Sequence, residues 1–358
     1  MKRLSPIAAA IILAFGIHTS VFADGSSATV SQDGNGNSAA VTQSNVPNGV
    51  NASVSQTGDM NAATVTQQNS IVNMTATVDT TGNNNSATVL QDDSWNAVST
   101  VTQDGTGNSA DISQTNFSDG GTTATVNQTG GTLNNSATID QSGAFASNAT
   151  IDQTNNSFGD GNSATIAQTG SFLSAHISQN DTQGDDATIM QSGSSNTANA
   201  LQDDSWFSTV DINQTGSDNV ASVSQTAISD SSSASIEQGG TQNQATINQQ
   251  SSSSASASID QDGSLNQATI NQQNAFGSGA TITQDLASSE NVALVTQLGS
   301  YNDANITQFT TGNQATVTQS GNGAFDNHNS ATITQNTPDN TATINQAGGG
   351  GNVATITQ

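Results

Sequence analysis

Apolar and polar residues alternate along this chain in short segments that each end in glutamine. The segment Gln56–Gln67 reads Q-T-G-D-M-N-A-A-T-V-T-Q, and close copies recur along the sequence. An Asn, an Ala, a Val or Ile and the closing Gln follow one another at intervals of two, with Thr, Ser, Asn or Asp between them. Successive side chains of a strand point to opposite faces, so these four residues share one face. The pattern predicts β-strands separated by Gly and Asn turns.

The number of repeats predicts the architecture. We count 28 such strands with closing positions 11 to 16 residues apart, and only Ala200 replaces the Val or Ile that comes two residues earlier. One strand alone buries little apolar surface, so the strands must stack to form a core. With two strands per rung, 28 strands give 14 rungs. We therefore expect an all-β solenoid of about 14 two-stranded rungs with cross-β hydrogen bonding.

In such a solenoid the inward side chains form columns from rung to rung. Gln and Asn amides would hydrogen-bond along their columns, and Ala with Val or Ile would form a thin dry core. The residues chosen to represent the columns are Gln32, Asn37, Ala39, Val41, Gln43, Gln56, Asn61, Ala63, Val65, Gln67, Gln103, Asn108, Ala110, Ile112, Gln114, Gln261, Asn266, Ala268, Ile270 and Gln272. Glycines two residues after a closing position would allow tight turns with positive φ. They are Gly34, Gly58, Gly82, Gly105, Gly193, Gly216, Gly263 and Gly299.

The N-terminal residues differ from the repeats. Residues 1–23 carry Lys2 and Arg3, a short apolar run and a small residue at position 23, which is typical of a secretory signal peptide cleaved before Asp24. Residues 24–358 would then form the repeat solenoid. The alternation of Asn-opened strands slips near residues 168–191, where Leu173 and Asp185 take the Asn position. Two blocks joined there are possible, although one continuous solenoid is preferred because no linker composition occurs.

Composition restricts the possible partners. The formal net charge is −26, and the only two basic residues are Lys2 and Arg3. Such a chain cannot bind nucleic acid through phosphate contacts, and it is not attracted to anionic lipid. It contains no Cys, so disulfides cannot stabilise it outside the cytosol. The polar composition is typical of disorder, but the strict apolar register favours an ordered fold.

The repeat also carries a family resemblance. The pattern Q-x-G-x-x-N-x-A-x-x-x-Q, with Ser26, Ser208 or Ser232 opening the alternate strand, resembles the curlin repeat of the curli-type fibre subunits of Gram-negative bacteria. The resemblance implies export through an outer-membrane pore, nucleation by a partner subunit at the cell surface, and polymerisation into extracellular amyloid fibres. Such fibres serve the biofilm matrix, adhesion and cell aggregation. This chain is longer than familiar subunits and almost lacks their polar export segment.

No arrangement of residues indicates catalysis or a cofactor. Beyond residue 23 the only histidines are His176 and His328, which lie far apart, and a solvated surface role is expected for His176. The pairs Asp92-Asp93, Asp185-Asp186 and Asp203-Asp204 have ligand oxygens suited to Ca²⁺. The Gly-rich motif of calcium-binding β-rolls is absent, however, so no specific metal site is predicted.

Acidic residues at outward positions have a simpler interpretation. Like charges on a strand face slow lateral association and premature aggregation, and protonating them should speed assembly. The candidates for this gatekeeper role are Asp111, Asp140, Asp152, Asp211 and Asp260.

Two other interpretations of the solenoid stay open. The chain could be a monomeric surface-binding protein, either an adhesin or an ice-binding protein with outward Thr-x-Thr pairs. Asp140, Ala167 and Met190 interrupt these pairs, which disfavours a lattice-matching face. We also expect Trp95, Trp206 and Tyr301 to lie in connections, either as adhesive contacts or as loop anchors.

Overall fold

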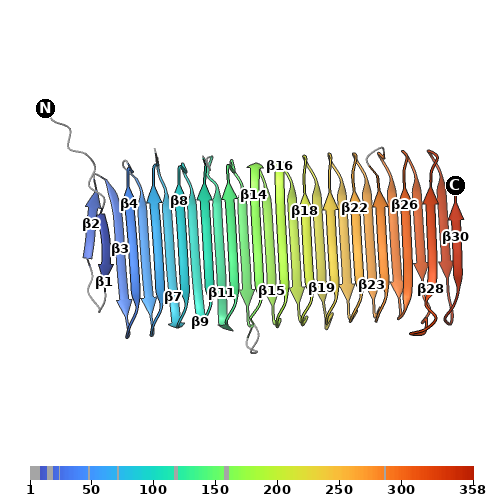
Figure 1. Cartoon of the computed structure of the whole chain (residues 1–358), viewed down its shortest axis with the longest axis horizontal. Helices are drawn as coiled ribbons and strands as arrows, with labels where there is room; N and C mark the ends of the chain where they lie inside the picture. The colour runs from blue at the N-terminus through green and yellow to red at the C-terminus, as the bar shows by residue number, and fades with distance from the viewer. Residues whose placement is uncertain are drawn as a thin grey trace. The chain divides into compact units, whose positions relative to one another are not determined.

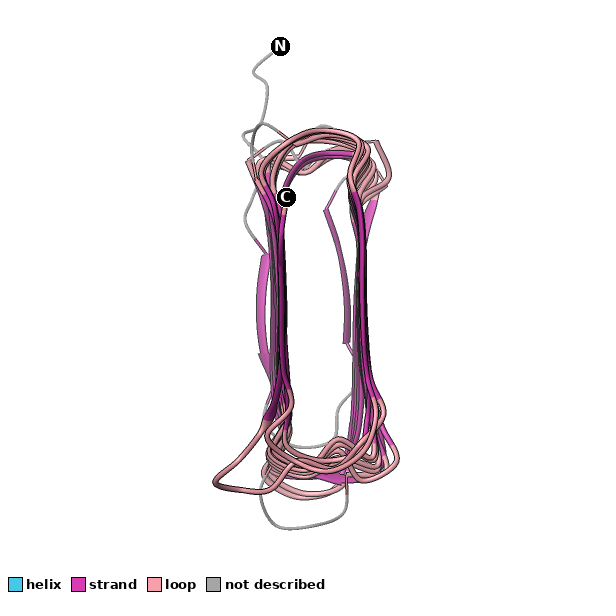
Figure 2. Cartoon of the chain, turned by 90° about the vertical axis from the view of Figure 1, so that its right-hand side faces the viewer, coloured by secondary structure: helices cyan, strands magenta, loops and turns pink. Residues whose placement is uncertain are grey.

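The computed structural model describes residues 9–13, 19–23, 25–46, 49–70, 72–116, 120–156, 161–285 and 288–358. The chain divides into two compact units, Met1–His176 (unit 1) and Ile177–Gln358 (unit 2). Within the described residues both units consist of strands and turns, without a helix. Strand β15 (Ser174–Asn180) crosses the division between them. In each unit the strands form two facing layers joined by turns at both edges (Figures 1 and 2).

Unit 1 contains two parallel sheets in which each strand pairs with the second strand before and after it. The odd sheet of unit 1 contains β3 (Ser26–Asp33), β5 (Asn51–Thr57), β7 (Thr75–Asn83), β9 (Val98–Thr106), β11 (Thr123–Leu133) and β13 (Asn148–Thr154). The even sheet contains β4 (Ser38–Ser44), β6 (Ala62–Gln68), β8 (Ser86–Asp92), β10 (Ser109–Thr115), β12 (Ser136–Ser142) and β14 (Ser163–Ser171).

Unit 2 repeats this topology. Its odd sheet contains β17 (Thr197–Asp203), β19 (Val220–Thr226), β21 (Gln244–Gln250), β23 (Gln267–Gln273), β25 (Val292–Leu298), β27 (Gln314–Gln319) and β29 (Thr341–Gln346). Its even sheet contains β16 (Asp186–Ser194), β18 (Thr209–Gln214), β20 (Ser233–Gln238), β22 (Ser256–Gln261), β24 (Gly279–Gln284), β26 (Asn302–Gln308), β28 (Asn329–Gln335) and β30 (Val353–Thr357).

Two further strands precede the first rung. β1 (Ala9–Leu13) pairs antiparallel with β4, and β2 (Thr19–Ala23) pairs antiparallel with β3. Both strands fall within residues 1–23, for which a cleaved signal peptide stays a prediction. All the other pairs named above are parallel.

The core of each unit is a set of identical side chains stacked in register. In unit 1, for example, Ala110 pairs with Ala137 and Ile112 pairs with Ile139 on the next rung. These four side chains are at most 2% exposed. Each fully buried Ile contributes roughly 1.5–3 kcal/mol to stability. β3–β30 make 28 strands, and the prediction of an all-β solenoid with two-stranded rungs is confirmed.

Candidate functional site

Buried glutamines at the closing positions form hydrogen-bonded ladders along the stacking direction. In the even sheet of unit 1, Gln43 Nε2 donates to Gln67 Oε1 at 2.9 Å, and Gln67 donates to Gln91 at 2.8 Å. Gln67 Nε2 also donates to the carbonyl of Asn51 at 3.0 Å, which lies in the opposite sheet. Each ladder therefore links successive rungs and also joins the two sheets of its unit.

The other predicted glutamines lie in equivalent ladders. In the odd sheet of unit 1, Gln32 donates to Gln56 at 2.7 Å and Gln103 donates to Gln128 at 2.9 Å. In the even sheet of the same unit, Gln91 donates to Gln114 at 2.9 Å. In unit 2, Gln238 donates to Gln261 and Gln249 donates to Gln272, both at 2.8 Å.

Thr80 interrupts the odd-sheet ladder of unit 1. It pairs in register with Gln56 on one side and with Gln103 on the other, and it is fully buried. Its shorter side chain does not reach the neighbouring amide. Thr80 Oγ1 and Gln103 Oε1 have no hydrogen-bond partner among the described residues. An unsatisfied buried polar group destabilises a fold by about 1–3 kcal/mol, so this rung is a weak point.

Buried asparagines before the strands form a second type of ladder. In unit 1 the backbone N–H of Asn61 donates to Asn37 Oδ1 at 2.9 Å, and the N–H of Asn108 donates to Asn85 Oδ1 at 3.0 Å. Asn37 Nδ2 donates to the carbonyl of Gly58 in the next turn at 2.7 Å. Each Asn therefore fixes the start of one strand and the turn of the following rung.

The asparagine ladder changes sheet between unit 1 and the start of unit 2, and the last rungs of unit 2 carry it in both sheets, because Asn302, Asn329 and Asn352 belong to even-sheet rungs. In unit 1 it precedes strands of the even sheet, whereas in unit 2 Asn196, Asn219, Asn243 and Asn266 precede strands of the odd sheet. The backbone N–H of Asn266, for example, donates to Asn243 Oδ1 at 3.0 Å. The sequence shift near residues 168–191 is thus a change in which sheet carries the ladder.

All eight predicted turn glycines have positive φ, between +93° and +139°. Most of these positions also require glycine because a side chain would collide with the next turn. A Cβ on Gly58 would lie 2.0 Å from the carbonyl oxygen of Gly82, and a Cβ on Gly216 would lie 2.0 Å from that of Gly240. Gly240 belongs to the same column and was missed, although it also comes two residues after a closing Gln. The glycines therefore allow adjacent turns to stack at strand spacing.

The ladder residues and turn glycines together correspond to a known repeat family. The model of the curlin associated repeat family matches residues 82–115 and 159–193. These two segments of the chain are therefore curlin repeats. The first match contains β8, β9 and β10 with Asn85, Asn108 and their glutamines. A comparison with curated proteins gave no match.

The outward carboxylates of the curlin repeats are not equivalent. Asp111, Asp140 and Asp211 are exposed, whereas Asp152 and Asp260 are half-buried. Although Asp211 is exposed as a residue, partial burial of its carboxyl raises its pKa. Burial also raises the pKa of Asp260, with smaller contributions from the charges of Asp262, Glu237 and Asp285.

Asp152 differs because it has hydrogen-bonded partners. His176 Nε2 lies 3.0 Å from Asp152 Oδ2, and Asn127 Nδ2 donates to Asp152 Oδ1 at 2.7 Å. The hydrogen bond with His176 is the main cause that lowers the pKa of Asp152. The sequence predicted a solvated surface role for His176, but its ring contacts a carboxylate instead. Asp152 is therefore less suited than the other four residues to act as an isolated repelling charge.

Asp185 is a buried carboxyl at the position where other curlin repeats carry Asn. It is 0% exposed. The backbone N–H of Ser208 donates to Asp185 Oδ1 at 2.8 Å, and the Ser205 hydroxyl donates to Asp185 Oδ2 at 2.6 Å. Burial raises the pKa of Asp185 to about 7, despite the opposing effect of these hydrogen bonds. The sequence placed Asp185 in the Asn position, but only the structure shows its complete burial.

Beyond residue 23, the described aromatic side chains lie in the turns, and in unit 2 three of them contact one another. The ring of Tyr301 meets Phe276 and Phe325 edge to face, with centroid distances of 5.5 and 6.0 Å. Trp206 is 47% exposed in another turn, and Trp95 is partly buried. Tyr301 therefore has the contacts of a loop anchor, and Trp206 is the more accessible side chain.

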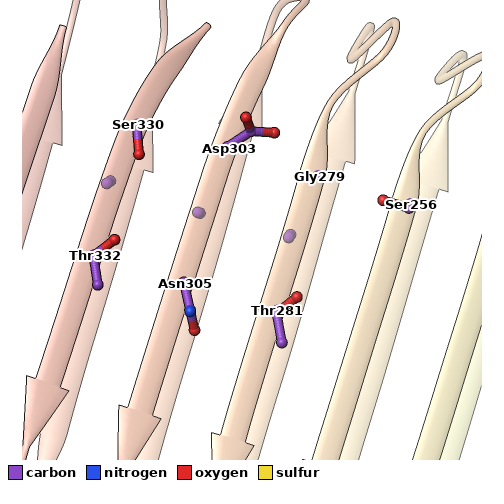
Figure 3. A pocket seen from close by; sticks show the side chains of 10 residues that line it. Ser256, Gly279, Thr281, Asp303, Asn305, Ser330 and Thr332 are labelled. Carbon is purple, nitrogen blue, oxygen red and sulfur yellow. The ribbon is translucent and has the colours of Figure 1, made fainter.

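The even sheet of unit 2 has a shallow hollow of about 240 Å³ where Gly279 interrupts a row of outward side chains. Ser256, Asp303 and Ser330 continue this row, and a second row contains Thr281, Asn305 and Thr332 (Figure 3). Asp303 Oδ2 lies 2.9 Å from His328 Nδ1. Across the described residues no three His, Cys, Asp or Glu side chains form a group that could hold a metal ion.

Among the described strands, β30 is paired on one side only. It pairs with β28, and Ile356 lies in register with Ile333. Ile333 is 0% exposed, whereas Ala354 and Ile356 are only half-buried and Val353 is 76% exposed. The side of β30 that faces away from β28 therefore exposes apolar and backbone groups, whereas the equivalent groups of inner strands are buried. Within the described residues, no helix is long and apolar enough to cross a membrane.

Proposed function

We propose that this protein is a secreted structural subunit that assembles copy upon copy into curli-like extracellular amyloid fibres. The observation that carries the proposal is the half-buried inward row of β30, which continues the core columns of unit 2. The first rung of another copy can extend these columns, because β4 carries Ala39, Val41 and Gln43 at the matching positions. The backbone edge supplies the hydrogen bonds of templated strand addition.

The ladders support this mechanism because each contact repeats between neighbouring rungs. Gln335 Nε2 donates to Gln358 Oε1 at 3.2 Å, so this ladder reaches the last residue described. An incoming Gln would accept the next bond from Gln358. Such ladders and in-register columns are the features that make cross-β assemblies stable.

The biological setting follows from the family resemblance. We propose that the fibres lie outside a Gram-negative cell, where they serve the biofilm matrix, adhesion and cell aggregation. The partners would be a nucleator subunit and an outer-membrane export pore. The interpretation as a monomeric adhesin or ice-binding protein has weaker support, because Met190 and Ala167 interrupt the outward Thr columns.

The decisive experiment uses residues 24–358 incubated at neutral pH. Electron microscopy and fibre diffraction should show long fibres with a reflection near 4.8 Å along the axis. Compact monomers with β-sheet circular dichroism and no fibres would contradict the proposal and favour a monomeric surface-binding protein.

A matched pair of variants in β30 tests the docking edge. Ile356→Asp places a charge where the incoming rung would bury it, so it should lengthen the assembly lag and slow elongation from added seeds at least tenfold. Thr355→Asp adds the same charge at an outward position and should elongate like the wild type. Equal elongation rates for the two variants would show that this edge does not template addition.

A further inference from the structure

Six adjacent strands of the odd sheet of unit 2 have a solvent face without charge. Strands β19, β21, β23, β25, β27 and β29 contain no ionisable residue. We name the outward residues of these six strands the neutral face. It is bounded at β17, where Asp203 occurs. The facing even sheet of unit 2 carries Asp186, Asp211, Glu237, Asp260 and Asp303 on its strands.

The side chains of the neutral face suit contact with another sheet. Val220, Val292 and Leu298 are large apolar side chains on this face, and each is 41–43% exposed. The amides between them already satisfy one another along the stacking direction. Asn248 Nδ2 donates to Asn271 Oδ1 at 2.9 Å, and Gln273 Nε2 donates to Gln250 Oε1 at 3.2 Å. These two bonds run along the stacking direction, so they would persist if this face were buried against another sheet, as amide ladders do in a steric zipper.

We propose that the neutral face of unit 2 pairs laterally with the same face of a second copy. The distribution of carboxylates over the sheets indicates which face of a second copy can pair with it. Any other copy carries a formal net charge of −26, so most approaches bring carboxylates together. Both sheets of unit 1 carry strand carboxylates, including Asp79 in the odd sheet and Asp111 in the even sheet. Among the described sheets, only the neutral face lets two copies meet over six strands without opposing charges.

The expected area explains when pairing occurs. Six strands of about seven residues at strand spacing give roughly 600 Å² per copy. A stable protein–protein interface buries about 800 Å² per partner. One pair of faces is therefore weak by itself. In a fibre of the kind proposed above, on which this step rests, every subunit presents the face, so lateral pairing strengthens with fibre length.

Two double variants place the same charge on opposite sheets. Thr246→Asp with Thr269→Asp changes register neighbours on the neutral face. Ser258→Asp with Thr281→Asp changes register neighbours on the even sheet and is the matched control. Fibre formation is followed by thioflavin-T and the 4.8 Å reflection, and lateral pairing by filament width in electron micrographs.

The wild type and the even-sheet variant should form paired filaments. The neutral-face variant should form single filaments with the same axial reflection, and the fraction of paired filaments should fall at least tenfold. Unpaired wild-type filaments, or equal effects of the two double variants, would overturn the proposal.

Absence of filaments in every sample would instead reject the fibre function. Pairing is then measured on soluble protein at high concentration by sedimentation equilibrium. Dimers of the wild type and of the even-sheet variant, with monomers of the neutral-face variant, would support the pairing surface. Monomers in every sample would reject it.

Discussion

At the scale of single residues, Asp185 shows how a curlin position accepts a different side chain. In unit 2 the N–H of Ser208 donates to Asp185 Oδ1 in the same way that the N–H of Asn219 donates to Asn196 Oδ1. The acceptor role is kept, but a charge replaces the amide. Burial therefore raises the pKa of Asp185 to about 7, with further contributions from the charges of Asp230 and Asp186.

This shift predicts a stability that falls as pH rises. The folded protein holds a proton on Asp185 up to a pKa of about 7, whereas the unfolded chain releases it near 3.8. Unfolding between these values releases a proton, so the contribution of Asp185 is full below pH 4 and is lost as pH rises to 7. Asp185→Asn should remove this loss and raise the free energy of unfolding by up to about 4 kcal/mol at pH 8.

Urea denaturation of freshly purified monomer between pH 4 and pH 8 measures this effect. Asp181→Asn is the control because Asp181 is an exposed residue of unit 2 and is not among the groups that shift the pKa of Asp185. A pH dependence that Asp185→Asn leaves unchanged would contradict the assignment.

At the scale of elements, stability depends on uninterrupted columns across the strands of a sheet. The column of closing residues is broken in β7, where Thr80 stands between Gln56 and Gln103. In β11, by contrast, Gln128 accepts a bond from Gln103 at 2.9 Å and donates to Gln153 at 2.8 Å. The two strands belong to the same sheet, but only β11 continues the hydrogen-bonded glutamine ladder.

Completing the column should stabilise unit 1. Thr80→Gln would supply an amide beside Gln103 Oε1 and should raise the free energy of unfolding by about 1 kcal/mol. Gln128→Thr creates a second break and should lower it by about 1–3 kcal/mol. Urea midpoints of the monomer check both values. Destabilisation by both substitutions would mean that the structure around β7 is already adapted to Thr80.

At the scale of the whole molecule, negative charge opposes association. The pKa values of Asp211 and Asp260 are raised, chiefly by burial, so these carboxylates become neutral at a higher pH than ordinary ones. Asp152 has a lowered pKa because of His176, and it keeps its charge to lower pH.

Acidification should therefore speed assembly. Thioflavin-T lag times should shorten from pH 7.5 to pH 4.5, because protonation removes repulsion between copies. Asp211→Asn combined with Asp260→Asn should shorten the lag at pH 7.5 and reduce its pH dependence, whereas Asp152→Asn should change it less. Lag times that stay constant or lengthen on acidification would contradict the gatekeeper role.

The sequence by itself determined the strands and their inward faces. Alternation is a local property, so the positions of Ala63, Val65 and Gln67 were sufficient to assign one face to β6. The turn glycines followed from their place after the closing residue. Repetition of the same pattern then indicated stacking, because a single strand has too little apolar surface to form a core.

Only the tertiary structure decided which atoms meet between rungs. Strands that pair in parallel are more than twenty residues apart, so the carbonyl of Gly82 that excludes a Cβ from Gly58 cannot be seen from local pattern. The same holds for the contact of His176 with Asp152 and for the burial of Asp185. Assigning alternate strands to separate sheets also revealed that carboxylates gather on one sheet of unit 2 and leave six strands of the other sheet neutral. Charge on a face depends on which strands share that face, and strand pairing across the rungs decides this.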